Sequence, residues 1–122
     1  MILSRIILFG NDITGLKRFY QSVFNLQLIE EIPDEWLVFK AGAMEIAFHR
    51  IGETFRNDLP FRAESNTKLV FNINDDLYEY RKILIAKGVK MNAIKSFEGI
   101  DFLFCDGEDI EGNVFQLSQK KS

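Results

Sequence analysis

The sequence has one cysteine, one histidine and two prolines among 122 residues. The single cysteine, Cys105, cannot form a disulfide within the chain, which is typical of a protein in a reducing compartment, so we expect a cytoplasmic location. The first ten residues, MILSRIILFG, are too short to span a bilayer, carry Arg5 in their middle and lack a small-residue cleavage pattern. We therefore expect neither a membrane span nor a signal peptide.

The sequence also lacks a large excess of either charge, because 15 basic and 18 acidic residues leave a net charge of −3. The basic residues are scattered along the chain and form no cluster of the kind that binds nucleic acid or an anionic membrane. Partners of both kinds are therefore not expected, and small molecules or proteins are. What the chain has in quantity is phenylalanine, with 12 residues, which favours a thick core or an apolar pocket.

Two segments of the chain repeat one pattern, since RIILFGND (5–12) and KLVFNIND (68–75) match in their apolar positions. Each is followed by apolar residues at helical spacing, which predicts a strand and then a helix in each half. Asp12 and Asp75 stand where helix N-caps are expected, and Asn25 and Gly88 stand where left-handed C-caps are expected.

Short strand patterns separated by turn residues follow each predicted helix. The expected strands are 27–32, 36–40 and 44–49 in the first half and 90–94, 100–105 and 113–118 in the second, with a turn at 106–112. The predicted fold class is α+β: one domain over 1–122 in which two β-α-β-β-β modules form curved sheets around a cleft. Module one is 1–52, a connection covers 53–66, module two is 67–119 and a short basic tail is 120–122.

The paired repeat, the helix sequence FYQSVFNLQL and the D-x-E-G-N turn at 109–113 resemble the vicinal oxygen chelate superfamily. That superfamily contains glyoxalase I, bleomycin-resistance proteins and extradiol dioxygenases, and the resemblance covers essentially the whole chain. It implies a homodimer whose paired modules come from one chain or from two. It also implies that the four positions that hold a metal in the metal enzymes correspond here to Arg5, Glu45, Lys68 and Gln116.

Only Glu45 among these four residues is a good metal ligand, because protonated arginine and lysine offer no lone pair. We therefore predict no metal and no cofactor. Two cations, one carboxylate and one amide can instead form a polar ligand-binding cluster whose excess positive charge favours an anionic ligand. The alternative is a purely structural network of salt bridges at the same place.

Two further residues are candidates for catalysis. His49 could move a proton, because imidazole gains and loses one near neutral pH, or it could be a surface residue at a strand end. Glu45 could act as a base, although the two nearby cations favour a pairing role. At ~3.3 Å per residue His49 lies roughly 13 Å along the strand from Glu45, too far to share one metal with it.

Two other chemical features have simpler interpretations. Cys105 lies beside acidic residues, which disfavour a thiolate, so we expect an inert thiol. The acidic run DGEDIEG (106–112) could suggest calcium, but it lacks the ligand spacing of an EF-hand loop.

The resemblance favours a metal-independent protein that binds or sequesters a small molecule in the cleft, similar to the bleomycin-resistance branch. The alternative is an enzyme of the same superfamily, an isomerase, lyase or dioxygenase-like protein, which uses charged side chains or a rearranged metal site.

Overall fold

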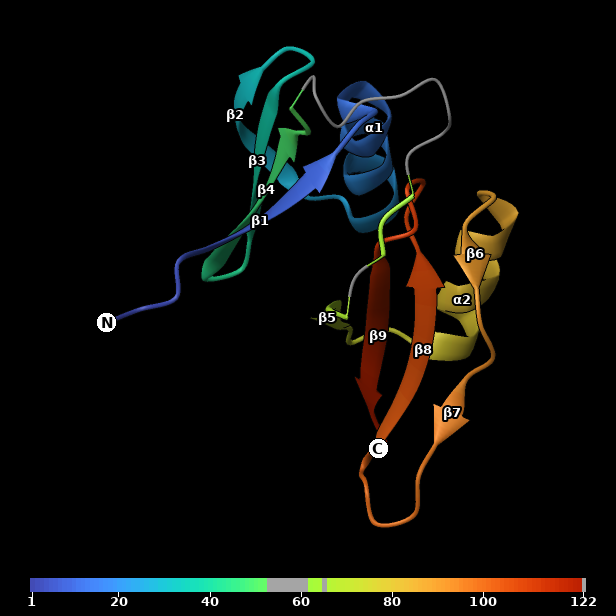
Figure 1. The fold of residues 1–122 in the computed structure, drawn as a ribbon. Coiled ribbons are helices and arrows are strands. Elements are labelled where there is room, and N and C mark those ends of the chain that lie inside the picture. The colour runs from blue at the N-terminus through green and yellow to red at the C-terminus, as the bar shows by residue number, and fades with distance from the viewer. Residues whose placement is uncertain (53–61, 65, 122) are drawn as a thin grey trace. The chain divides into compact units, whose positions relative to one another are not determined.

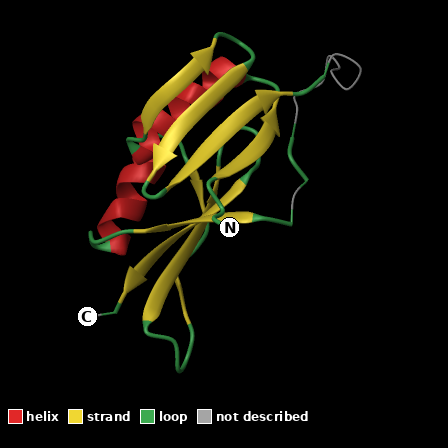
Figure 2. Cartoon of the chain, turned by 90° about the vertical axis from the view of Figure 1, so that its left-hand side faces the viewer, coloured by secondary structure: helices red, strands yellow, loops and turns green. Residues whose placement is uncertain are grey.

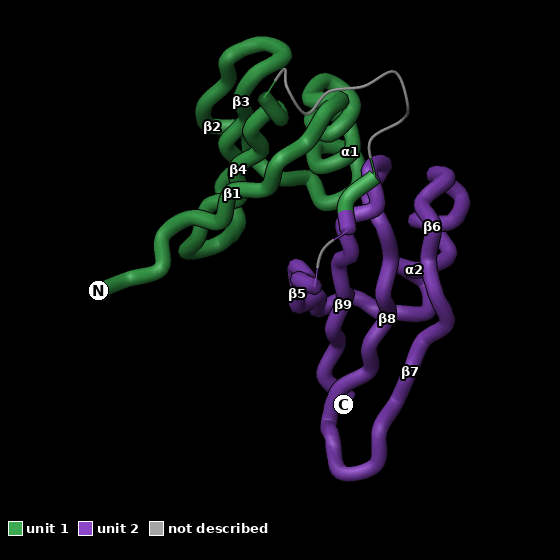
Figure 3. Tube along the Cα trace, in the orientation of Figure 1, with its two compact units in different colours: residues 1–63 green, residues 64–122 purple. Residues whose placement is uncertain are grey.

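The computed structural model describes residues 1–52, 62–64 and 66–121. The chain divides into two compact units, residues 1–63 and 64–122, which Figure 3 colours separately. Most of the predicted connection, 53–66, lies outside the described residues. Within the described residues, each unit contains one helix and its own sheet (Figure 1). No helix in the described parts of the chain is long and apolar enough to cross a membrane.

Unit 1 has the predicted β-α-β-β-β order. Its elements are β1 (Arg5–Gly10), α1 (Ile13–Phe24), β2 (Gln27–Ile32), β3 (Trp36–Ala41) and β4 (Met44–Arg50). The strand order in the sheet is β1-β4-β3-β2, with β1 parallel to β4 and the other neighbours antiparallel. The parallel pair forms because the connection through α1, β2 and β3 returns the chain beside β1.

The core of unit 1 lies between α1 and one face of this sheet (Figure 2). Tyr20 is fully buried there, with its ring 4.7 Å from that of Phe48 and 6.0 Å from that of Phe39 between centroids. The helix ends are as predicted: Asp12 accepts a hydrogen bond from the Gly15 amide at 3.0 Å, and Asn25 adopts the left-handed conformation with φ 53°.

Unit 2 repeats this plan with one strand divided in two. Its elements are β5 (Lys68–Asn72), α2 (Leu77–Ala86), β6 (Lys90–Met91), β7 (Lys95–Ser96), β8 (Phe102–Glu108) and β9 (Val114–Lys120). The strand order is β5-β9-β8-β6, and β7 also pairs with β8. The prediction of one strand over 90–94 was wrong, because the Asn92 carbonyl turns toward α2 and accepts a hydrogen bond from Arg81 Nε at 2.8 Å.

The predicted N-cap of α2 was wrong by one residue, since Asp76 and not Asp75 caps it. Asp76 accepts from the Tyr78 amide at 3.0 Å, and Gln119 on β9 accepts from the Leu77 amide at 2.7 Å. This bond from another strand satisfies a donor at the start of the helix, a partner that local sequence does not show. The positive φ predicted for Gly88 is confirmed at 85°.

The turn before the last strand is shorter than predicted. Strand β8 continues to Glu108, so Asp106 lies within the sheet and not in a turn. Asp109 is the residue that closes the turn, because it accepts from the amides of Glu111 and Asn113 and from Asn113 Nδ2. Strand β9 continues to Lys120, so the predicted basic tail 120–122 begins inside a strand.

Candidate functional site

The face of the unit 1 sheet opposite α1 carries the polar residues predicted for this module. Residues alternate between the two faces of a strand, so Arg5, Ile7 and Phe9 on β1 share this face with their register partners Glu45, Ala47 and His49 on β4. Ile46 and Phe48 lie on the other face, where they are buried in the core. The strand pattern therefore places Arg5 directly beside Glu45.

Arg5 has two partners on this face. Its Nε donates to Glu45 Oε1 at 2.9 Å, and its Nη2 lies 2.7 Å from the same oxygen. Its guanidinium carbon also lies 5.6 Å from the centre of the Trp36 ring, within the range of a cation–π contact. The pairing role predicted for Glu45 is thus what the structure shows, because a cation already occupies one of its oxygens.

His49 lies farther along the same face, beside an open groove of about 390 Å³. The groove is lined by Ile7, Phe9, Ile32, Glu35, Trp36 and His49. The imidazole makes edge-on contacts with Phe9 and Trp36, each at 5.8 Å between ring centroids. The exposed strand-end position expected for His49 is confirmed, and the sequence alone did not indicate its two aromatic neighbours.

In unit 2 a carboxylate that the sequence analysis missed joins the two predicted residues. Lys68 Nζ lies 2.7 Å from Asp106 Oδ2, and Gln116 Nε2 donates to Asp106 Oδ1 at 3.0 Å. Asp106 is the register partner of Gln116 in the β8–β9 ladder. Strand β8 extends three residues beyond the predicted end at 105, so Asp106 was assigned to the turn and its pairing with Gln116 was not predicted.

The charge of Asp106 is stabilised by its surroundings. Partial burial by itself would raise the pKa of this carboxyl, but hydrogen bonds from Lys68 and Gln116 and the positive charges of Lys68 and Lys95 outweigh that effect. The pKa of Asp106 is therefore lowered from its usual value. This residue is a fixed negative charge at neutral pH.

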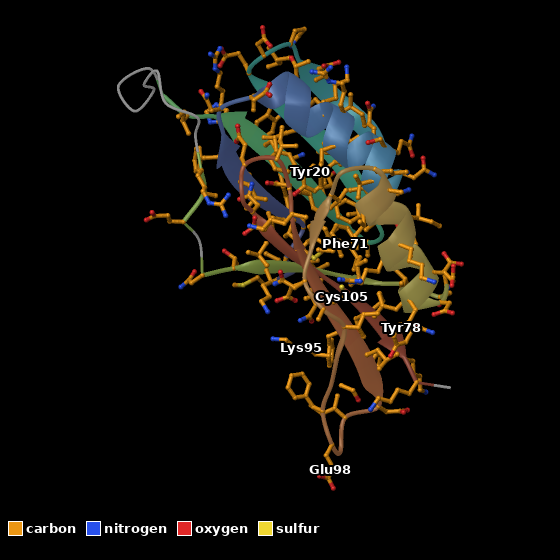
Figure 4. The ribbon with its side chains drawn as sticks, turned by 90° about the vertical axis from the view of Figure 1, so that its right-hand side faces the viewer. Tyr20, Phe71, Tyr78, Lys95, Glu98 and Cys105 are labelled. Atoms are coloured by element: carbon orange, nitrogen blue, oxygen red, sulfur yellow. The ribbon has the colours of Figure 1, made fainter. Side chains whose placement is uncertain are left out.

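Asp106 lies in a pocket of about 100 Å³ on the face of the unit 2 sheet opposite α2. The pocket is lined by Lys68, Asn92, Ala93, Lys95, Phe97, Phe104, Asp106 and Gln116, and we call it the Lys68 pocket. Figure 4 labels Lys95, the first residue of β7, and Glu98 in the loop that connects β7 to β8. Two cations and one anion give the pocket a net charge of +1 at neutral pH.

The four residues predicted as one cluster form two pairs, each complete within its own unit. Arg5 pairs with Glu45 in unit 1, and Lys68 and Gln116 share Asp106 in unit 2. That all four serve one ligand stays a prediction.

No protein-family model and no curated protein matches this sequence, but solved structures match its fold along nearly its whole length. A lactoylglutathione lyase from Agrobacterium tumefaciens is 18% identical with a TM-score of 0.73, over 98% of this chain and 94% of that one. The fosfomycin resistance protein FosX from Listeria monocytogenes is 22% identical with a TM-score of 0.76, over the same two shares. FosX from Mesorhizobium loti is 20% identical with a TM-score of 0.71, over 98% and 93%.

The chain has the vicinal oxygen chelate fold. The resemblance drawn from FYQSVFNLQL and the D-x-E-G-N turn is thus confirmed for the fold. Identity near one residue in five does not carry activity over from these proteins.

The four residues that the resemblance assigns to metal positions, Arg5, Glu45, Lys68 and Gln116, do not suit a divalent metal. Arg5 and Lys68 are cations bound to Glu45 and Asp106, so neither offers a lone pair and both repel a metal ion. Among the described residues, no three side chains of His, Cys, Asp or Glu come together as a metal site requires. Arg5 and Lys68 instead form ion pairs with Glu45 and Asp106.

The two remaining chemical candidates have structural roles. The carboxylate of Asp109 is occupied by the hydrogen bonds of its own turn, which argues against a calcium ligand there. Cys105 is buried, burial raises the pKa of its thiol, and its Sγ lies 3.2 Å from the Asn92 carbonyl oxygen. A protonated, buried thiol is unreactive, as the sequence predicted.

Proposed function

We propose that this protein binds a small anionic molecule in the Lys68 pocket without a metal and leaves it chemically unchanged. The observation that supports this proposal is the pairing of two lysines with one carboxylate in a partly enclosed pocket. Lys68 has three ammonium donors, and the structure assigns one of them to Asp106. Donors therefore remain for an anion that enters the pocket.

The size of the Lys68 pocket restricts the ligand. About 100 Å³ corresponds to roughly three water molecules at ~30 Å³ each, well below the ~300 Å³ at which drug-sized sites begin. The pocket therefore suits a compact charged group such as a carboxylate or an oxyanion of phosphorus or sulfur. Phe97 and Phe104, with ring centroids 6.1 Å apart, line its wall and can contact an apolar substituent of the ligand.

One solved structure of the same fold supports a small anion as ligand class. A variant of FosX from Listeria monocytogenes, 22% identical over 100% of this chain and 92% of that one, was solved with Mn(II) and 1S,2S-dihydroxypropylphosphonic acid. That protein binds its phosphonic acid together with a metal. The metal-independent part of our proposal rests instead on the ion pairs of this chain.

The proposal is tested by titration of acetate and sulfate into isotopically labelled protein, followed through the backbone amide signals of Asp106 and Gln116. Lys68→Met should weaken the binding of either anion at least tenfold, because it removes an ammonium that donates hydrogen bonds in the pocket. Lys90→Met is the matched control, since Lys90 pairs with Glu108 at 3.4 Å in the same sheet but does not line the pocket. Unchanged affinity in Lys68→Met would contradict the proposal.

A second candidate function is suggested by His49. Its imidazole borders a groove of about 390 Å³ and could transfer a proton to a ligand held there, in an enzyme in which Arg5 of the same sheet face stabilises a negatively charged oxygen. If a bound ligand is converted and His49→Gln abolishes the conversion, the protein is an enzyme and not a sequestering protein. Spectra of the ligand itself, recorded during the same titration, distinguish these two functions.

We also propose that the protein is a cytoplasmic homodimer. Apolar side chains that are about half exposed in the described chain, including Ile7 and Phe9 on β1 and Val70 on β5, support a further contact surface. A second copy of the chain is the partner that the fold suggests.

A further inference from the structure

Asp106 is the central residue of the Lys68 pocket. One of its carboxylate oxygens is bound by Lys68 at 2.7 Å and the other by Gln116 at 3.0 Å. Its side chain is 23% exposed, whereas that of Lys68 is 48% exposed. An anion from solution therefore reaches the lysine more readily than the carboxylate, and it meets a lysine that already has a negative partner.

We propose that Asp106 is an internal counter-anion that makes the Lys68 pocket select singly charged ligands over doubly charged ones. This inference rests on the proposed function, because it names the charge class of the anion that binds there.

The charge of the pocket is the first part of the argument. Lys68 and Lys95 contribute two positive charges and Asp106 one negative charge, which leaves a net charge of +1. A singly charged ligand neutralises this charge. A doubly charged ligand leaves one uncompensated negative charge in a pocket that is partly withdrawn from water, which is unfavourable.

The position of Asp106 beside Lys68 is the second part. The ammonium of Lys68 is tetrahedral, so a ligand oxygen bound to another of its N–H groups would lie roughly 4 to 5 Å from the Asp106 oxygen that Lys68 contacts. Two negative charges at this distance repel each other strongly when they are partly shielded from water. This repulsion grows in proportion to the charge of the ligand. Asp106 therefore lowers the affinity for a dianion by about twice the free energy that it costs a monoanion.

The same contacts have a simpler alternative, in which Asp106 only orients Lys68 and Gln116. Removal of its charge would then leave Lys68 less well positioned and weaken the binding of every anion. The two roles predict changes of opposite sign, so one substitution separates them.

The test compares acetate, a monoanion, with sulfate, a dianion, in wild-type protein and in Asp106→Asn. The variant keeps the size of the side chain and an acceptor for Gln116 while it removes the charge. We expect acetate to bind about threefold more tightly and sulfate about tenfold more tightly, since the free-energy change doubles with ligand charge. Asp106→Ser, a smaller uncharged replacement, should give the same order, and it replaces Asp106→Asn if that variant does not fold.

Glu108→Gln is the matched control. Glu108 lies two residues from Asp106 on the same face of β8 and also pairs with a lysine, Lys90, but it does not line the pocket. Removal of its charge should change either affinity less than twofold, because its distance from the ligand and the solvent screen its effect. Asp106→Glu, which retains the charge, should retain the preference of the wild-type protein for acetate.

The outcomes separate this inference from the proposed function. If wild-type protein binds acetate and Asp106→Asn gains no affinity for sulfate relative to acetate, the inference is overturned and the proposed function stands. If only Asp106→Asn binds either anion, the wild-type pocket binds and selects no anion, so the proposed function and the inference are both contradicted. If neither protein binds either anion, both fail.

Discussion

Units 1 and 2 have the same order of elements but place their charged groups differently. In both units a cation stands at the start of the first strand, as Arg5 in β1 and Lys68 in β5. In unit 1 its carboxylate partner is Glu45 on the neighbouring parallel strand, whereas in unit 2 the partner is Asp106, two strands away. The strand between them supplies Gln116, which donates to the same carboxylate.

Both cations thus have a carboxylate partner, but a different strand of the sheet supplies it in each unit. A side chain on any strand can be that partner when it points to the same face of the sheet as the cation. The resulting surfaces differ in chemistry. Unit 1 has a mainly apolar groove with a histidine, and unit 2 has a small positively charged pocket.

The two cores also differ, and Tyr20→Ala should give the largest effect on stability. This tyrosine fills the aromatic core of unit 1, while α2 in unit 2 buries only leucines, Leu77 and Leu84. We expect a loss of about 3 to 5 kcal/mol in the free energy of unfolding, as for other buried aromatic residues replaced by alanine. Trp36 is the one tryptophan of the chain and lies in unit 1, so urea unfolding followed by its fluorescence reports on this unit.

Tyr20→Phe is the control for that measurement. It keeps the ring and removes only the hydroxyl, so its cost should be about 1 kcal/mol. A loss in Tyr20→Ala no larger than in Tyr20→Phe would show that the aromatic core does not stabilise unit 1 as we infer.

Gly107→Ala should have the next largest effect, in unit 2. A Cβ atom at Gly107 would lie 2.5 Å from Met91 Sδ and 2.5 Å from Phe115 Cζ, closer than van der Waals contact allows. We expect a loss of about 1 to 3 kcal/mol, typical of overpacking in a filled core. Thermal unfolding would measure it. Phe115→Leu in the same chain should reduce the cost of the alanine, and additive losses in the double variant would contradict the predicted clash.

Replacement of Arg5 or Lys68 should have the smallest effects on the free energy of unfolding, and it compares the two units directly. Arg5→Met should cost about 1 kcal/mol, because Arg5 makes both an ion pair and a contact with Trp36. Lys68→Met should cost about 0.5 kcal/mol or less, since the more exposed Lys68 makes one ion pair. Urea midpoints of the two variants decide the order, and a larger loss in Lys68→Met would reverse this view of the two sites.

Much of the fold could be predicted from the sequence because it depends on local patterns. The match between RIILFGND and KLVFNIND revealed two modules, and helical spacing with Asp12, Asn25 and Gly88 located both helices and three of their four ends. The alternation of residues along β4 placed Glu45 and His49 on one face of that strand. These features follow from backbone geometry within a few residues, which a sequence displays directly.

The composition of the sites was decided by tertiary structure. Asp106 meets Lys68 and Gln116 because of the register between β8 and β9 and the placement of β5 beside β9, contacts between residues far apart in the chain. In the same way, β1 and β3 lie on the two sides of β4, one parallel and the other antiparallel to it, and bring Phe9 and Trp36 to His49. The predicted strand ended at 105, three residues before β8 ends, so Asp106 was placed in a turn and its partners in the sheet were not predicted. The sequence alone determined the two modules and their cations, Arg5 and Lys68. The register of strand pairing decided which side chains meet those cations, because contacts between distant segments of the chain set that register.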